Sequence, residues 1–289
     1  MFNNAIRLSV YAVLTYTFIS CNSGKAKQAP IAKQDTLTSK RDTPAVDSEA
    51  FEIDSNFQNY PLDFINDSAV LKYPARILTT GQFHEDEVVR EDEGHSWYGI
   101  FMNSTGYYLD STSLITKRVE DPVSDEKEGQ KTGWEVKTSN NDTSFLLISG
   151  VDGLSKRKIV PATIRKKEIL PGESTTFSYN GITYTLYATG KKQKEGNNSD
   201  YFLVGNYRLF IKATINGTER NQMLVSSRVC DDTMIEILFA GDIDGDNIPD
   251  LIINTSYHYN AIVPTLYLSK PAGDKEILKV MGWHLSVGC

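Results

Sequence analysis

The sequence predicts an all-β body, because short β-branched and aromatic runs alternate with turn residues and no sustained helical period occurs. Apolar residues nowhere recur at the 3.6-residue spacing of a helix, so only a few short helices are expected. We therefore expect an antiparallel, sandwich-like or partial propeller-like body. The expected strands are Arg76–Thr80, Trp97–Met102, Gly133–Thr138, Phe145–Ser149, Thr175–Tyr179, Ile182–Thr189, Tyr207–Ile215, Gln222–Ser227, Met234–Ala240 and Thr265–Ser269.

Two hairpins carry the strongest local signal. Asn180-Gly181 separates Tyr179 from Ile182, and Asn216-Gly217 separates Ile215 from Thr218. Asn and Gly both accept the positive φ of a type I′ turn, whose twist matches that of the strands beside it. Each pair therefore predicts a two-residue turn between antiparallel strands.

The body divides, on the sequence, into a first β subdomain at residues 57–155 and a second at 156–289. The polar segment 153–161 is the expected connector between them. Acidic, turn-rich loops at 84–94 and 120–131 interrupt the first subdomain. The chain shows no repeat at a fixed period, which argues against a complete multi-blade propeller.

The N-terminus has the pattern of an export signal. Arg7 precedes an apolar run at 8–19, which is shorter than the roughly 20 residues that span a membrane. A small residue, Ser20, stands directly before Cys21. The run Phe18-Ile19-Ser20-Cys21 resembles the lipobox of bacterial lipoproteins, although those usually carry Leu at the position of Phe18. The resemblance implies that residues 1–20 are removed and Cys21 is lipidated; an ordinary signal peptide or an uncleaved anchor is the alternative.

Residues 21–56 follow as a polar segment with few aromatic or large apolar side chains. Such a composition cannot bury enough surface to offset the entropy of ordering, so a disordered tether is expected. The implied partner is a membrane, reached through the lipid at Cys21, and the implied location is the cell envelope. By resemblance, Asn22 after the cysteine favours the outer membrane.

Composition limits the remaining partners. The formal net charge is −7 and basic residues occur only in short runs, so nucleic acid is not an expected partner. With Cys21 lipidated, Cys230 and Cys289 form the one possible intrachain disulfide in an oxidising compartment. Two free thiols, or an intermolecular bond at Cys289, are the alternatives that spacing leaves open.

The loop after the strand Met234–Ala240 carries the clearest chemistry. Asp242, Asp244, Asp246 and Asp250 place four carboxylates in nine residues, and Gly245 allows the chain to turn sharply. Their repulsion is severe unless a cation lies between them. Oxygen ligands without His or Cys select a hard ion, and a flexible loop with many ligands favours Ca²⁺ over Mg²⁺.

An EF-hand is excluded, because Asn247 and Ile253 stand where that motif needs Gly and Glu. The stretch resembles instead the Asp-x-Asp-Gly-Asp-x-x-x-Asp-Leu loop of FG-GAP and VCBS-type repeats, in which a loop between two strands wraps one Ca²⁺. The resemblance covers about 20 residues. It implies a structural calcium ion, held by the side chains of Asp242, Asp244, Asp246 and Asp250 and the backbone carbonyl of Ile248. Asn247 replaces the usual Gly.

Other candidate residues have simpler interpretations. His84 and His95 flank acidic runs, but their spacing fits no zinc motif, so a solvated acidic loop is expected. His258 is expected in a half-buried cluster at a strand end. Trp97, Trp134 and Trp283 are expected to pack in or around the core rather than to form a sugar platform.

The expected function is that of a calcium-stabilised envelope lipoprotein, which binds a protein or glycan partner and has no catalytic constellation. The alternative is a secreted hydrolase that uses acidic residues of the first-half loops. Activity on glycan, peptide or ester substrates, lost on single Asp or Glu changes, would favour the hydrolase.

Overall fold

The computed structural model describes residues 51–61, 73–194 and 201–288. The expected signal segment, Cys21, most of the tether and Cys289 lie outside these residues. The first-half elements are β1 (Arg76–Leu78), β2 (Gly81–Phe83), η2 (Arg90–Gly94), β3 (Trp97–Asn103), β4 (Gly106–Thr112), β5 (Leu114–Val119), β6 (Gly133–Thr138) and β7 (Thr143–Ser149). They are followed by β8 (Arg157–Ile159), β9 (Ser174–Tyr179), β10 (Ile182–Lys194), β11 (Phe202–Ile215), β12 (Thr218–Cys230) and β13 (Glu236–Gly241). The last are β14 (Asp250–Asn254), β15 (Ala261–Ile262), β16 (Pro264–Leu268), η3 (Lys270–Ala272), β17 (Lys279–Trp283) and β18 (Ser286–Val287).

The all-β prediction is confirmed. The described residues contain no helix of seven or more residues, and the two helical segments, η2 and η3, are 3₁₀ helices of five and three residues. The strand pairs within the sheets are antiparallel. No helix in the described ranges is long and apolar enough to cross a membrane.

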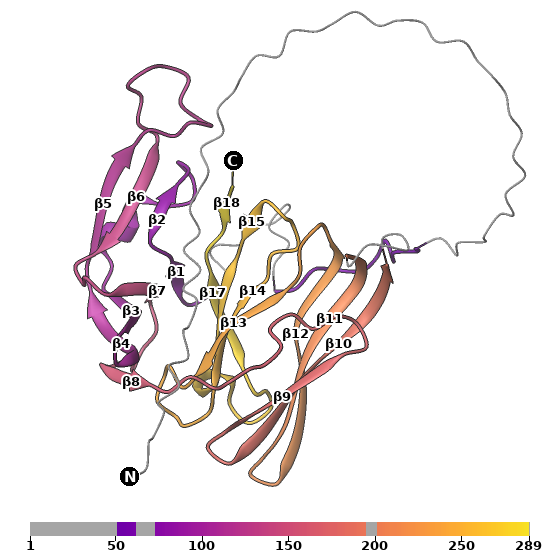
Figure 1. Ribbon diagram of the computed structural model, residues 1–289. Coiled ribbons are helices and arrows are strands. Elements are labelled where there is room, and N and C mark those ends of the chain that lie inside the picture. The colour runs from indigo at the N-terminus through magenta and orange to yellow at the C-terminus, as the bar shows by residue number, and fades with distance from the viewer. Residues whose placement is uncertain (1–50, 62–72, 195–200, 289) are drawn as a thin grey trace, which may run out of the picture. The chain divides into compact units, whose positions relative to one another are not determined.

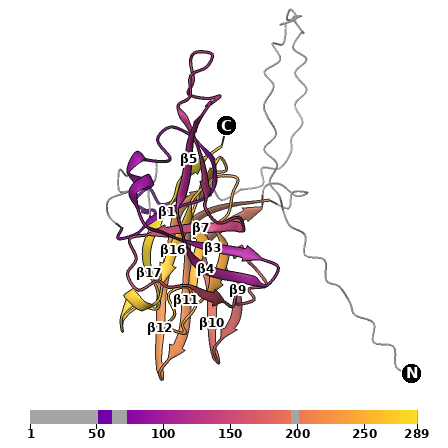
Figure 2. The same cartoon turned by 90° about the vertical axis from the view of Figure 1, so that its left-hand side faces the viewer.

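Three of the sheets form layers, with the sheet β13-β14-β16-β17 in the middle (Figure 1). Ile253 and Tyr267 pack toward the sheet β12-β11-β10-β9, in a core with Tyr207. Their strand neighbours Ile252 and Leu266 belong to a second core, formed with the sheet β1-β7-β3-β4-β8. Figure 2 shows the strands β3, β4 and β7 in front of the C-terminal strands.

This arrangement explains the composition of the middle strands. Every residue of β16 and four of the five in β14 are buried, because both faces of the sheet are covered. A sheet covered on both sides reads as a continuous apolar run rather than as an alternation of apolar and polar residues. In contrast, β10 belongs to an outer sheet and alternates over its first seven residues, as expected of a strand with one solvated face.

Both predicted hairpin turns are present. Asn180 and Gly181 have φ of 46° and 80°, and Asn216 and Gly217 have φ of 50° and 77°. Tyr179 pairs with Ile182 across the first turn, and Ile215 with Thr218 across the second. The strands beside them are longer than predicted, because the ladder continues where Lys191–Lys194 of β10 pair with Phe202–Gly205 of β11.

Several strands were not predicted, among them β4, β5 and β17. In β4, Gly106, Asp110 and Ser111 resemble turn residues, yet the strand pairs along its length with β3. In β17, Gly282 permits a close approach, since a Cβ there would lie 2.2 Å from the carbonyl oxygen of Ala75. Their pairing partners, rather than their own propensities, hold these segments extended.

The expected boundary at 155/156 does not coincide with a boundary between cores. β8 lies beyond it, but it is the edge strand beside β4 in the first-half sheet. The second core contains Ile77 and Ile100 from the first half together with Phe239 and Met281 from the second. The described residues belong to one compact unit.

His284, beside β17, is a buried neutral base that should make the fold sensitive to acid. Its Nε2 lies 3.2 Å from the carbonyl oxygen of Glu87 and its Nδ1 lies 3.2 Å from Thr79 Oγ1. Burial, with the charge of Arg76, lowers the pKa of His284 to about 4. Since the unfolded chain binds that proton near pH 6.5, stability is fully present above that pH and is lost as the pH falls toward 4.

We expect this histidine to account for a loss of up to about 3 kcal/mol between pH 7 and pH 4. The measurement is urea unfolding of wild type and of His284→Gln at both pH values. The difference in stability between the two proteins should shrink on acidification. A constant difference would show that His284 does not titrate as described.

Candidate functional site

The acidic loop joins two strands of the middle sheet, as the resemblance implied. β13 ends at Gly241, which pairs with Asp250 at the start of β14. Between them Gly245 has φ of 84° and Asn247 has φ of 71°. Asn is among the few residues besides Gly that adopt positive φ readily, so Asn247 satisfies the backbone need that Gly meets in the family motif.

Asp242 organises the first half of the loop. Its Oδ1 accepts the backbone N–H groups of Gly245 and Asp246, at 2.5 and 3.1 Å, and its Oδ2 accepts that of Asn247 at 3.0 Å. The backbone N–H of Asp242 in turn donates to the hydroxyl of Tyr179 at 3.3 Å. These bonds curl the chain around one carboxylate and tie it to the β9–β10 hairpin.

Asp250 closes the loop from its other end and is completely buried. Its Oδ2 accepts the N–H groups of Ile243 and Asp244, at 2.6 and 3.1 Å. Its Oδ1 accepts the N–H and the hydroxyl of Ser269, at 2.7 and 3.0 Å. Burial, together with the charge of Asp244, raises the pKa of Asp250 well above its usual range.

Asp244 is the buried carboxylate that lacks partners. Its Oδ2 accepts the N–H of Lys270 at 3.1 Å, but its buried Oδ1 has no hydrogen-bond partner among the described residues. The residue is only 4% exposed. Burial, followed by the charges of Asp246 and Asp242, raises the pKa of Asp244 to about 6. An ionised oxygen in this position is costly unless a positive charge approaches it.

The structure brings together three of the five predicted ligands. Asp242, Asp244 and Asp250 each offer a carboxylate oxygen, and these oxygens lie within 4.8 Å of one another. Asp246 is not part of this group; its Oδ1 accepts the N–H of Ile248 and the hydroxyl of Ser269, at 2.8 and 3.0 Å. The side chain of Ile248 is half-buried and packs against the core that contains Tyr207.

Sequence reasoning missed Ser269 and Lys270, which follow β16. Ser269 bonds to both Asp250 and Asp246, and the Lys270 N–H bonds to Asp244. Ser269 is 19 residues from Asp250, so only the pairing of β14 with β16 brings it to the loop. No local spacing in the sequence could have indicated it.

Comparison with known proteins finds no matching family model, no matching curated protein and no matching solved structure. The site is therefore interpreted from its own geometry.

The structure describes only Cys230 of the three cysteines. Cys230 ends β12 and is buried, and burial raises the pKa of its thiol to about 12. Cys21 and Cys289 lie outside the described residues, so the lipidation and the disulfide stay predictions. Next to Cys289, the N–H of Gly288 donates to the Asn260 carbonyl at 2.8 Å, and Asp231, next to Cys230, donates its N–H to Tyr257.

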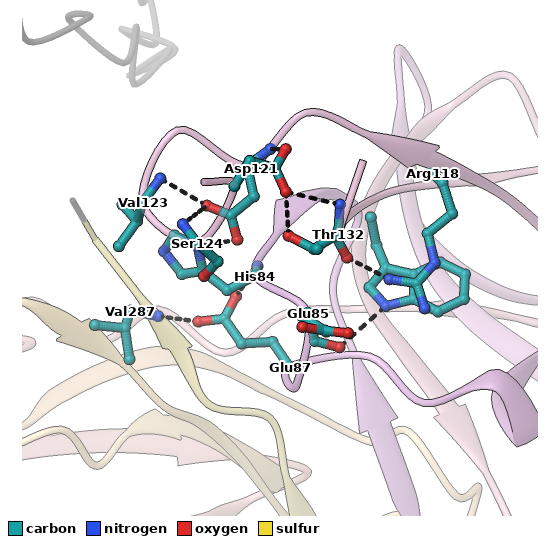
Figure 3. Close-up of polar contacts among 11 residues, drawn as sticks. His84, Glu85, Glu87, Arg118, Asp121, Val123, Ser124, Thr132 and Val287 are labelled. Carbon is teal, nitrogen blue, oxygen red and sulfur yellow. Dashed lines mark hydrogen bonds and ion pairs between the residues drawn. The ribbon is translucent and has the colours of Figure 1, made fainter. Parts of the chain in front are cut away.

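A second polar cluster lies in the first-half loops (Figure 3). His84 Nδ1 lies 2.8 Å from Asp121 Oδ2, and Glu87 accepts the N–H groups of His84 and Val287. Burial alone would lower the pKa of His84, but the hydrogen bond and charge of Asp121 raise it above its usual value. Asp121 also accepts hydrogen bonds from the N–H groups of Val123 and Ser124. Burial alone would raise the pKa of Asp121, but these two bonds and the one from His84 lower it below its usual value.

The expected solvated acidic loop is only partly solvated. Glu85, Asp86, Glu91 and Glu93 are exposed, as are the charges of most such runs. Glu87 and Asp92 are the buried exceptions. Asp92 forms a bidentate pair with Arg76, in which Nε to Oδ1 is 2.8 Å and Nη2 to Oδ2 is 2.9 Å. Charge density alone could not show which acid of the run faces inward.

The remaining candidates pack as expected. Trp97 and Trp134 are buried and Trp283 is half-buried. His258 is half-buried near Asp231, with 3.4 Å between Nε2 and Oδ2, and stacks on Tyr259. His95 is exposed beside Trp97.

Proposed function

We propose that the protein is a lipid-anchored component of the bacterial cell envelope, whose β body binds one calcium ion and acts by binding a partner rather than by catalysis. The calcium ion has a structural role: it neutralises the loop that joins β13 to β14. The lipid on Cys21 holds the body at a membrane through the tether of residues 21–56.

The calcium proposal is carried by the buried Oδ1 of Asp244, which has no hydrogen-bond partner in the ranges that the structure describes. It belongs to a group of three carboxylates with oxygens within 4.8 Å of one another. Hard cations such as Ca²⁺ are bound by several oxygen ligands of this kind. A cation at this position would satisfy the oxygen and offset the burial and the mutual repulsion that raise the pKa values of Asp244 and Asp250.

Calcium is expected to raise the thermal stability of the full chain in detergent. At a hundred times its Kd the ion adds about 2.7 kcal/mol, which corresponds to roughly 5–10 °C in Tm for a body of this size. Asp244→Asn should abolish the shift, while Asp152→Asn, in an exposed turn, should keep it. An unchanged Tm across millimolar calcium, compared with a chelator, would remove the ion from the proposal.

The anchor is tested separately. Cys21→Ala should eliminate labelling by a radioactive fatty acid and release the chain from the membrane fraction, because the single lipid-bearing residue is lost. Cys289→Ser is the matched control and should retain both properties. Persistent labelling of Cys21→Ala would contradict the anchor and leave the calcium proposal untouched.

The contacts in the first-half loops support the non-catalytic proposal over a hydrolase. Asp92 is paired with Arg76, Glu87 accepts two backbone N–H groups, and Asp121 accepts two backbone N–H groups besides its contact with His84. Carboxylates engaged in this way orient loops. They are less available to take or give a proton to a substrate.

A further inference from the structure

A cavity of about 620 Å³ lies beside the acidic loop. Its walls come from β8, the connector at 160–163, the end of β9 with its turn, and the loop residues Asp242 and Asn247. Its volume is within the range of about 300–1,000 Å³ that is typical of sites for small ligands. The walls come from segments far apart in the chain, and the neighbouring loop is the proposed calcium site.

Two cations line this cavity without an acidic partner. Arg157 and Lys158 belong to β8, and neither forms an ion pair with a carboxylate of the described residues. Ser155 holds the guanidinium of Arg157 through two hydrogen bonds. Arg157 Nε donates to the Ser155 carbonyl at 3.2 Å, and Arg157 Nη2 donates to Ser155 Oγ at 3.0 Å. Ser155 thus occupies the Nε–Nη2 edge of the guanidinium and leaves the Nη1–Nη2 edge, whose two donors can bind a carboxylate.

The acidic residue in the wall does not compete for these cations. Both carboxylate oxygens of Asp242 accept backbone N–H groups within its own loop. The guanidinium of Arg157 lies against the same loop, since a Cβ on Gly245 would be 1.4 Å from Nη1. The positive charge of β8 is therefore left for a ligand, and its position depends on the loop.

The remaining walls offer neutral polar groups and one aromatic ring. Ser178, Asn180 and Thr163 are exposed hydroxyl and amide side chains, and Tyr179 is half-buried. Asn180 Nδ2 donates to the carbonyl of Asn247 at 2.8 Å, which fixes that amide across the cavity. Hydroxyl and amide groups around an aromatic ring match the hydroxyl groups and the apolar face of a sugar.

We propose that this cavity binds a uronic acid, the carboxylate-bearing sugar residue of an acidic glycan. The fork of Arg157 and the charge of Lys158 would bind the carboxylate, and the side chains of the β9–β10 turn would bind the hydroxyl groups. The inference deepens the proposed binding function and rests on it. It does not require calcium in order to be tested.

The test is isothermal titration calorimetry of the full chain in detergent with galacturonate, galactose and inorganic phosphate, each in calcium and in chelator. Galacturonate should bind, while galactose and phosphate should bind at least about tenfold more weakly, because each lacks one of the two recognised features. An oligogalacturonide tests whether the site takes a terminal residue of a longer glycan. Equal binding of phosphate, equal binding of galactose, or no heat with galacturonate in either buffer would overturn the proposal.

Two paired variants place the site. Arg157→Gln with Lys158→Gln should weaken galacturonate binding at least about tenfold, since hydrogen bonds to charged groups are lost. Lys127→Gln with Lys275→Gln removes the same charge from exposed positions outside the cavity and should leave binding unchanged. Lys158→Gln alone, at an exposed position, serves if the pair with Arg157 does not fold. If galacturonate binds equally well to Lys158→Gln and to the double variant, the ligand does not bind in this cavity and the proposal is wrong.

The failure of this inference is distinguishable from the failure of the calcium proposal. If calcium shifts the Tm but galacturonate gives no heat, the cavity proposal is wrong and the calcium proposal stands. If galacturonate binds equally in calcium and in chelator and calcium does not shift the Tm, the calcium proposal is wrong and the cavity proposal stands.

Discussion

Asp250→Ala is expected to lower the free energy of unfolding by at least about 3 kcal/mol, even in the presence of a chelator. The carboxylate is fully buried and accepts three backbone N–H groups and the hydroxyl of Ser269. Each buried donor left without a partner costs about 1–3 kcal/mol. The loss of three backbone partners therefore dominates any relief of charge repulsion with Asp244.

The measurement is urea unfolding in chelator, with Asp152→Ala in an exposed turn as control. Asp244→Asn makes the sharper contrast, because Asp244 Oδ1 has no hydrogen-bond partner within the described part of the chain. That variant should be at least as stable as wild type in chelator and less stable in calcium. A loss below about 1 kcal/mol in Asp250→Ala would contradict the role assigned to its hydrogen bonds.

Arg76→Met is the second change with a large expected effect. It leaves the Asp92 carboxylate buried with the N–H of Val89, at 3.1 Å, as its remaining charge-stabilising contact among the described residues. Removing one partner of a buried ion pair typically costs about 3–5 kcal/mol. In urea unfolding, the loss of stability caused by Arg76→Met should therefore lie in that range.

Combining Arg76→Met with Asp92→Leu should recover much of the loss, because no uncompensated charge then remains buried. Lys137→Met is the control: its pair with Glu135 is exposed, with 64% of the lysine side chain accessible, and its loss should be within about 0.5 kcal/mol. Equal effects of Arg76→Met and Lys137→Met would mean that the Arg76 pair is solvated in solution.

The fold class and the hairpins could be predicted because their signals are local. Asn-Gly turns specify positive φ at two residues, and the runs around them carry β-branched side chains. The layering could not be predicted in the same way. The apolar runs of β14 and β16 indicate strands covered on both faces, but they do not say which sheets cover them.

The candidate site, too, could be predicted only where its signals are local in the sequence. The spacing of Asp242, Asp244 and Asp250 in the sequence indicated the group that the structure brings together. Ser269 reaches the loop only because β14 pairs with β16. Its hydroxyl then bonds to Asp246, which lies outside the group of three carboxylates. The burial of Asp92 and of Glu87 within acidic runs likewise depends on partners more than ten residues away, such as Arg76 and Val287.

The layered arrangement has a consequence for the order of synthesis. The sheet that covers the first-half strands is made from residues 236–283, so the second core cannot close until nearly the whole chain exists. Contacts this distant in sequence carry a large loop-closure cost and form slowly. During synthesis, the apolar face that carries Ile77 and Ile100 therefore stays uncovered until the strands of the middle sheet have emerged.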